Sequence, residues 1–251
     1  VDILWLDGGW VRKMSDEEAR NYRMAQGNKM TRVQSQDIRM DELVAKAREK
    51  QPGLIVVDRA VYGKNQNYLT PENRVPEKAL PYPWESCIIA GGGWAWVPDP
   101  KFMSPREAIH LLVDIVVKGG NLLLNIGPAP DGTWPSEAYT LLDAIGSWMK
   151  VNGEAIYGTR TLAPHKDGKT CITRKGDDTL YLYYMADEGE EMPASFTMTG
   201  LTLPAGARVT FTGSEAVCKW KNGENSFTVF PPARARKTPP TDYVWVMKVS
   251  L

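Results

Sequence analysis

The hydrophobic pattern of the sequence changes once, near residue 159, and this change limits the fold more than any other feature. Before it, apolar runs alternate with stretches whose apolar residues recur every three or four positions, the pattern of buried strands and amphipathic helices. After it, short runs of β-forming residues follow one another between turn residues. We therefore expect an α/β part over residues 1–158 and an all-β part over residues 159–251.

Four apolar runs are the predicted strands of the first part, at 3–6, 54–59, 84–90 and 121–126. Near-continuous apolar character is typical of parallel strands that are covered on both faces. Helical patterns begin near residue 40, after Ser104 and at Ser136, and Ser104-Pro105-Arg106-Glu107 has the cap, proline and acid of a strong helix start. Four strands alternating with helices make half of a (β/α)8-type barrel, which needs eight strands.

The second part is predicted to be an antiparallel β-sandwich, because several short strands occur at close spacing. Its predicted strands are 170–174, 179–185, 195–198, 208–212, 227–230 and 243–249. The basic stretch 231–237 is interpreted as a solvated loop.

Composition excludes several classes of function. The 30 basic and 30 acidic residues cancel, so no overall field favours nucleic acid or an anionic membrane, and no apolar run approaches the ~20 residues that span a bilayer. Cys87, Cys171 and Cys218 form no metal or redox motif and are predicted to be free, mostly buried thiols. With only His110 and His165, a histidine metal site is not expected. We expect no metal and no cofactor, and we place His110 on the surface.

The most informative stretch is 3–10, Ile-Leu-Trp-Leu-Asp-Gly-Gly-Trp. Asp7 would lie at the C-terminal end of a buried strand, where β/α barrels carry their chemistry. Gly8 and Gly9 would allow a sharp turn and the close approach of a ligand. The alternative is an aspartate that only hydrogen-bonds its own turn, and this stretch alone slightly favours that alternative.

This octapeptide resembles the nucleophile motif of the glycoside hydrolase family 29 α-L-fucosidases. Three later segments match the same family in the same order: Tyr-Leu-Thr-Pro-Glu-Asn at 68–73, Pro-Trp-Glu-Ser-Cys at 83–87, and Lys-Gly-Gly-Asn-Leu-Leu-Leu-Asn-Ile-Gly-Pro at 118–128. The resemblance runs from residue 2 to about residue 160, and it is specific because the motifs occur in combination.

The resemblance implies the second half of the catalytic barrel followed by a C-terminal β-sandwich. It also implies a retaining α-L-fucosidase that removes terminal α-L-fucose from fucosylated oligosaccharides or glycoconjugates, in a periplasmic or extracellular location. Asp7 corresponds to the nucleophile and Glu72 to the acid/base. Glu72 is expected on a mobile loop, buried against Tyr68 and Trp94, because burial would raise the pKa of a proton donor.

For several other candidate site residues, more than one role is consistent with the sequence. Glu77 and Glu85 are reserve candidates for the acid/base, although Glu85, within an apolar strand, better suits a structural or sugar-hydroxyl contact. Arg59 resembles the family arginine that contacts the sugar, or it forms a structural ion pair with Asp58 or another acid at the rim; the two readings are even. Trp94 matches the aromatic residue that the family places against fucose.

Two further residues near these motifs are expected to be structural. Trp96 is interpreted as a packing residue. Asn125 is interpreted as a polar residue satisfied at a strand end rather than as a lining residue of the barrel mouth.

The N-terminal half of the family's barrel has no counterpart here, and the chain begins with Val1, not Met, directly at the first predicted strand. We therefore expect a fragment, or a processed or truncated chain, that is incomplete as an enzyme by itself. The unpaired edges of a half barrel would bind the missing half or a second copy of the chain. The competing hypothesis is a catalytically incompetent carbohydrate-binding or interaction fragment.

Overall fold

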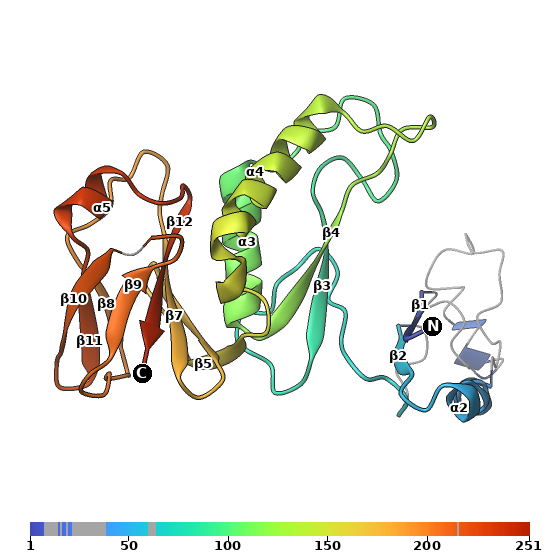
Figure 1. Cartoon of the computed structure of the whole chain (residues 1–251). Helices are drawn as coiled ribbons and strands as arrows, with labels where there is room; N and C mark the ends of the chain where they lie inside the picture. Colours follow the sequence, from blue (N-terminus) through green and yellow to red (C-terminus); the bar gives the residue numbers. More distant parts are fainter. Residues whose placement is uncertain (8–14, 16, 19, 22–38, 60–63, 215) are drawn as a thin grey trace. The chain divides into compact units, whose positions relative to one another are not determined.

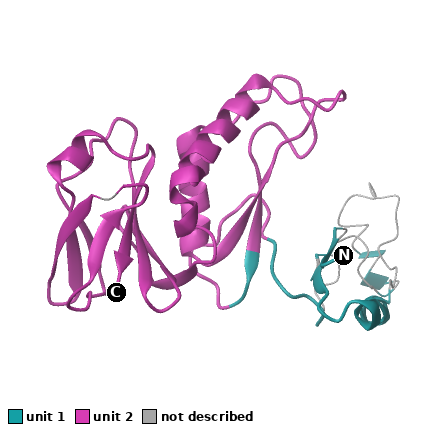
Figure 2. Ribbon diagram, in the orientation of Figure 1, with its two compact units in different colours: residues 1–70, 82–84 teal, residues 71–81, 85–251 magenta. Residues whose placement is uncertain are grey.

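The computed structural model describes residues 1–7, 15, 17–18, 20–21, 39–59, 64–214 and 216–251 (Figure 1). The predicted turn at Gly8 and Gly9 lies outside these residues. The chain forms two compact units, 1–70 with 82–84, and 71–81 with 85–251 (Figure 2).

The first unit contains a parallel strand pair with a helix against one of its faces. Strand β1 (Ile3–Leu6) pairs with β2 (Ile55–Asp58) in the register Ile3 to Ile55 through Leu6 to Asp58. Helix α2 (Met40–Lys50) joins them in sequence. Its buried residues pack with one side of both strands in a cluster formed by Met40, Val44, Leu54 and Val56, with Leu4, Leu6 and Ala47 at its edge.

A reciprocal capping pair, formed by Ser15 and Glu18, lies ahead of α2 in the sequence. The Ser15 hydroxyl accepts a hydrogen bond from the backbone N–H of Glu18 at 3.2 Å, and the Glu18 carboxylate accepts one from the Ser15 N–H at 2.8 Å. This reciprocal pair satisfies two N–H groups that a helix N-terminus otherwise leaves without partners.

The second unit begins with two strands and two helices. Strand β3 (Trp84–Ile89), whose first residue belongs to the first unit, pairs with β4 (Gly120–Asn125), and helix α3 (Pro105–Val117) connects them. The predicted capping box of α3 is confirmed, since Ser104 and Glu107 hydrogen-bond each other's backbone. Helix α4 (Ser136–Asn152) follows β4 and ends in a short 3-10 turn, η2 (Gly153–Ala155).

The rest of the second unit is one continuous antiparallel sheet of eight strands, in the order β5-β6-β7-β12-β9-β10-β11-β8. At the two ends of this order, the Thr199 backbone N–H donates to the Asp167 carboxylate at 3.0 Å, so the sheet folds back on itself around a core. The strands are β5 (Arg160–Asp167), β6 (Thr170–Lys175), β7 (Thr179–Met185), β8 (Phe196–Thr199), β9 (Arg208–Phe211), β10 (Val217–Asn222), β11 (Ser226–Phe230) and β12 (Val244–Ser250).

The central strands of this sheet are buried on both faces. On β12, Trp245 and Met247 face the core inside the folded sheet, whereas Val244 and Val246 pack against α3 and α4. This arrangement explains why the strand reads as nearly continuous apolar sequence. Figure 1 shows α3 and α4 between the β3–β4 pair and the antiparallel sheet.

Three elements of this part were not predicted. Strand β5 contains Pro164 and a register shift between Thr161 and Lys166, and β10 buries little except Cys218, so neither has the expected pattern of a strand. The basic stretch predicted as a loop forms the short helix α5 (Ala233–Lys237), in which Ala235 is buried.

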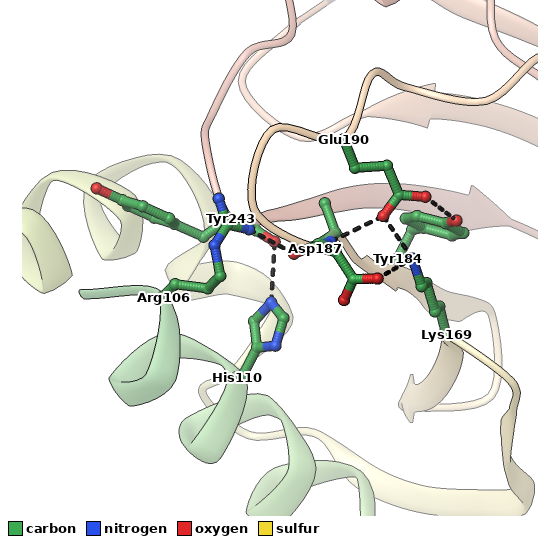
Figure 3. A network of polar contacts seen from close by, with 8 residues as sticks. Arg106, His110, Lys169, Tyr184, Asp187, Glu190 and Tyr243 are labelled. Atoms are coloured by element: carbon green, nitrogen blue, oxygen red, sulfur yellow. Dashed lines mark hydrogen bonds and ion pairs between the residues drawn. The ribbon is translucent and has the colours of Figure 1, made fainter. Parts of the chain in front are cut away.

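The surface position predicted for His110 is wrong. His110 is half-buried where α3 meets the sheet, and its Nε2 donates to the carbonyl of Tyr243 at 3.1 Å (Figure 3). Burial lowers the pKa of His110, although the hydrogen bond to Tyr243 opposes the shift. Helix α3 is covered on two sides, which a single hydrophobic stripe does not reveal.

A polar network lies beside His110 at the same junction (Figure 3). Lys169 forms ion pairs of 2.6 Å with Asp187 and Glu190, and the Tyr184 hydroxyl donates to Glu190 at 2.7 Å. Burial raises the pKa of Glu190, but its hydrogen bonds to Lys169, to the Asp187 backbone and to Tyr184 outweigh burial and lower it overall. These contacts fix the segment that follows β7.

The described residues also bear on the cysteines, on metal binding and on membrane spans. Cys87, Cys171 and Cys218 are buried and form no disulfide, as predicted. No group of His, Cys, Asp and Glu side chains within the described ranges is arranged to hold a metal ion. In the same ranges, no helix combines the length and apolar character needed to cross a bilayer.

Candidate functional site

Asp7 and Arg59 meet at the ends of the paired strands β1 and β2. Because the register places Leu6 opposite Asp58, the next residue of each strand lies at the same edge of the pair. An Oδ1 atom of Asp7 lies 3.3 Å from Nη1 of Arg59. The Arg59 side chain is 16% exposed and that of Asp7 is 61% exposed. The parallel pairing thus places a carboxylate and its counterion together at one rim.

Both residues lie on the strand face that points away from the helix. Leu4 and Leu6 pack against the α2 cluster, and side chains alternate along a strand, so Trp5 and Asp7 lie on the other face. The Arg59 guanidinium carbon is 4.8 Å from the centroid of the Trp5 ring. Asp7 and Arg59 thus lie at the C-terminal ends of the two strands, on the side that α2 does not cover.

Tyr68 follows a segment that is tied to β2. The Asn67 backbone N–H donates to the carbonyl of Val56, and the Asn67 side chain accepts from the N–H of Val56, both at 2.8 Å. Tyr68 itself is half-buried. These bonds place Tyr68 in the first unit, with Asp7 and Arg59.

Glu72 lies in the second unit, and its surroundings differ from those expected. Its neighbours Pro71 and Asn73 exchange backbone hydrogen bonds with Cys87 of β3, at 3.1 and 2.8 Å, which forms a parallel bridge between Glu72 and Cys87. The predicted mobile loop is therefore hydrogen-bonded to β3 at this point. The Glu72 side chain is exposed, so its own unit does not provide the burial expected of a proton donor.

Glu85 has the more buried environment of the reserve candidates. It is half-buried on β3, and burial raises its pKa, whereas Glu77 is exposed. Ala90 packs with α3 and α4, so by alternation Glu85 and Cys87 face away from these helices. The Glu72 bridge opposite Cys87 places both candidate acids on the helix-free face of β3.

Trp94 and Trp96 project from the loop that follows β3. Their exposed fractions are 45% and 43%, so the prediction that Trp96 is a packing residue is wrong. The Asn125 side-chain amide donates to the carbonyls of Gly93 at 3.3 Å and Trp94 at 3.2 Å. Asn125 is thus satisfied at its strand end, as predicted, and it also fixes the loop.

Gly127 gives this loop the space that it needs. A Cβ atom at Gly127 would lie 2.6 Å from the carbonyl carbon of Ala95 and 2.7 Å from the backbone nitrogen of Trp96. Sequence reasoning missed this role, although a glycine directly after a strand is a signal of close backbone approach. The loop's shape therefore depends on Asn125 at the end of β4 and on Gly127 two residues beyond it.

A cavity of about 550 Å³ lies between the 100–105 segment and the first turns of α4. It is lined by none of the candidate site residues. Its lining residues are Pro100, Lys101, Phe102, Met103, Pro105, Ser136, Glu137, Thr140 and Leu141.

Comparisons with known proteins point to one family. The α-L-fucosidase family model matches residues 1–154. The chain is 38% identical to rat plasma α-L-fucosidase over 112 residues, which cover 43% of this chain and 24% of the relative. It is 27% identical to human tissue α-L-fucosidase over 196 residues, which cover 73% of this chain and 40% of the relative.

A solved structure extends the similarity to the fold of the whole chain. Alpha-L-fucosidase isoenzyme 1 from Paenibacillus thiaminolyticus matches with a TM-score of 0.74 and 24% identity, covering 100% of this chain and 58% of that protein. The chain thus spans less than two thirds of each of these proteins. Since the family model matches more than half of it, the chain belongs to the α-L-fucosidase family of glycoside hydrolases.

Proposed function

We propose that this chain carries the catalytic carboxylates and the C-terminal domain of a retaining α-L-fucosidase. Its substrates are fucosylated oligosaccharides or glycoconjugates with terminal α-L-fucose. The observation that carries the proposal is the contact between Asp7 and Arg59 at the ends of two parallel strands, on the face away from the helix. Membership of the α-L-fucosidase family supports the sugar specificity.

Asp7 is the proposed nucleophile. One of its carboxylate oxygens attacks the anomeric carbon of fucose, and the bond from that carbon to the leaving oxygen breaks as the acid donates its proton to that oxygen. A covalent fucosyl ester on Asp7 results. Asp7 suits this step because strand pairing and Arg59 fix its position at an exposed rim.

Glu72 is the proposed acid/base, with Glu85 as the reserve. After the first step the resulting carboxylate removes a proton from water, the water oxygen attacks the anomeric carbon, and Asp7 is released as a carboxylate. A retaining mechanism requires the two carboxyl groups to be about 5–5.5 Å apart. The pKa of Glu85 is raised by burial, as a proton donor needs, whereas Glu72 matches the position of the family motif.

The remaining site residues are proposed to bind the sugar. Arg59 has several N–H donors suited to sugar hydroxyls, and the exposed ring of Trp94 offers an apolar face to fucose. Tyr68 adds a hydroxyl from the first unit. If Glu72 is the acid/base, Glu85 takes the role of a hydroxyl partner.

The fold-level part of the proposal is a half barrel over residues 1–158 and a separate β-domain over residues 159–251. Apolar side chains are exposed on three strands: Ile3 of β1 by 47%, Ile55 of β2 by 39% and Leu123 of β4 by 46%. This exposure supports the proposal that a partner covers these strands in the active enzyme. The partner would be the other half of the barrel or a second copy of this chain. We expect the purified chain to associate, which size-exclusion chromatography measures.

The test of the function is the replacement Asp7→Asn in the active assembly, meaning this chain together with the other half of the barrel. It should abolish hydrolysis of an aryl α-L-fucoside and leave the circular dichroism spectrum unchanged. A 2-deoxy-2-fluoro-fucosyl fluoride should add one fluorofucosyl group to the peptide that contains Asp7, as detected by mass spectrometry.

Full activity of Asp7→Asn, or labelling of another carboxylate, would remove Asp7 from this role. Binding of fucosylated glycans without hydrolysis by the wild type would support the alternative of a non-catalytic fragment.

A further inference from the structure

One arginine side chain joins the proposed nucleophile to an aromatic ring. The Arg59 guanidinium lies 4.8 Å from the Trp5 ring centroid and 3.3 Å from the Asp7 carboxylate. The Arg59 side chain is 16% exposed, although Asp7 beside it is 61% exposed. The arginine is therefore held largely within the protein while the carboxylate remains accessible.

The strand pairing accounts for this arrangement. Trp5 lies opposite Val57 in the register, so Asp7 and Arg59 are each two positions further along their strands. Side chains two positions apart share a face, and this face points away from the α2 cluster. Trp5 and Asp7 are therefore neighbours of Arg59 on this face of the pair.

The contact between Trp5 and Arg59 is of a kind that can hold an arginine side chain in one position. A guanidinium is planar, so its face can lie on an aromatic ring while its edges donate hydrogen bonds. Four rotatable bonds separate the guanidinium from the backbone, and an unsupported arginine samples many rotamers. A ring against one face restricts that sampling without using any of the N–H donors.

Among the described residues, no hydrogen bond of its own holds the Trp5 ring in place. Its indole Nε1 is buried and has no hydrogen-bond partner within the part of the chain that the structure describes. The part of Trp5 that meets Arg59 is the aromatic ring. Phenylalanine at this position would keep an aromatic face and remove no hydrogen bond between described residues.

We propose that Trp5 is a positioning residue for the reaction: its ring fixes Arg59, and Arg59 in turn fixes the attacking carboxylate of Asp7. This inference rests on the proposed function, because it assumes that Asp7 is the nucleophile. It adds a specific role for Trp5, which acts on the reaction through its contact with Arg59.

The kinetic test compares Trp5→Phe with Trp5→Leu in the active assembly. Trp5→Leu should lower kcat for an aryl α-L-fucoside by about tenfold or more, because small displacements of a reacting group are costly, with a smaller change in KM. Trp5→Phe should restore most of kcat. Leu4→Val is the matched control, since it removes packing on the α2 side of the same strand and should change stability but not kcat.

A second measurement tests the contact without any activity. The Arg59 Nε–H signal, assigned by its loss in Arg59→Lys, should show an upfield ring-current shift in the NMR spectrum of the chain. Trp5→Leu should abolish the shift and Trp5→Phe should keep part of it. Wild-type kcat in folded Trp5→Leu, or an unshifted Arg59 signal in the wild type, would overturn the proposal. Inactivity of the wild-type assembly with a shifted Arg59 signal would instead count against the proposed function.

Discussion

The Asn125 side-chain amide donates to the carbonyl of Trp94 at 3.2 Å and thereby ties the end of β4 to the loop that follows β3. A second bond from the same amide, to the Gly93 carbonyl at 3.3 Å, holds the preceding residue. Two carbonyls that converge on one NH2 group define which way the loop turns. The exposed rings of Trp94 and Trp96 are thus carried by a backbone fixed from a neighbouring strand.

Asn125→Asp should disturb this loop. The substitution is nearly isosteric, but it replaces the donor with a carboxylate facing two carbonyl oxygens, which should cost about 1–3 kcal/mol in the free energy of unfolding. Thermal denaturation measures the loss, and KM for a fucoside should rise if Trp94 contacts the sugar. Asn121→Asp, at the exposed start of the same strand, is the control and should have little effect. An unchanged Tm in Asn125→Asp would show that the two hydrogen bonds do not hold the loop.

His110 should make stability depend on pH. Its pKa in the folded chain lies below the ordinary value of 6.5, mainly through burial, with Arg106 acting in the same direction and Tyr243 and Asp187 opposing it. Between the folded pKa and 6.5 the unfolded chain binds more protons, so stability rises with pH across this window. The contribution is present above 6.5 and is lost as the pH falls towards the folded pKa.

His110→Gln tests this pH dependence, because glutamine keeps a donor for the Tyr243 carbonyl and does not titrate. Urea denaturation at a series of pH values should show a smaller loss of stability for the variant than for the wild type as the pH falls below 6.5. Equal losses would show that another group is responsible. The cluster of Lys169, Asp187 and Glu190 is unchanged in the variant. Its own effect on the pH dependence of stability should therefore be the same in both proteins.

The sequence predicted elements best where local signals decide the structure. Helix α3 begins where Ser104, Pro105 and Glu107 predicted it, because capping depends on adjacent residues. His110 was misplaced because its environment includes Tyr243, which lies 133 residues further along the chain, directly before β12. Strand β5 was missed because proline and charged residues obscure its pattern, while hydrogen bonds to β6 maintain it.

Some features of the candidate site could be predicted from the sequence, and others could not. The chemical types at Asp7 and Arg59 follow from the motif, and their contact follows from parallel pairing. The exposure of Glu72 and the role of Gly127 depend on contacts between segments that are distant in the sequence. The residues next to Glu72 and Gly127 do not reveal these contacts.

The proposed boundary at residues 158 and 159 predicts how a shorter chain behaves. One face of the antiparallel sheet packs on the helices through Tyr181, Tyr183, Val244 and Val246. The indole N–H of Trp148 also donates to the carbonyl of Val244 at 3.0 Å. Residues 159–251 expressed alone should expose this apolar face and therefore associate and bind a hydrophobic dye. A monomer that binds no dye would show that the β-domain is independent of the helices.

The final prediction separates Glu72 from Glu85 as the acid/base. An aryl fucoside with a good leaving group needs little proton donation, whereas a natural glycan needs full assistance at the leaving oxygen. Replacement of the true acid by glutamine should therefore slow glycan hydrolysis far more than cleavage of the activated substrate. Replacement of a residue that only binds the sugar should slow both substrates by similar factors. Because Glu72 matches the family motif, we expect Glu72→Gln to show the leaving-group dependence and Glu85→Gln to show the uniform loss. The reverse pattern would assign proton donation to Glu85, whose pKa burial already raises.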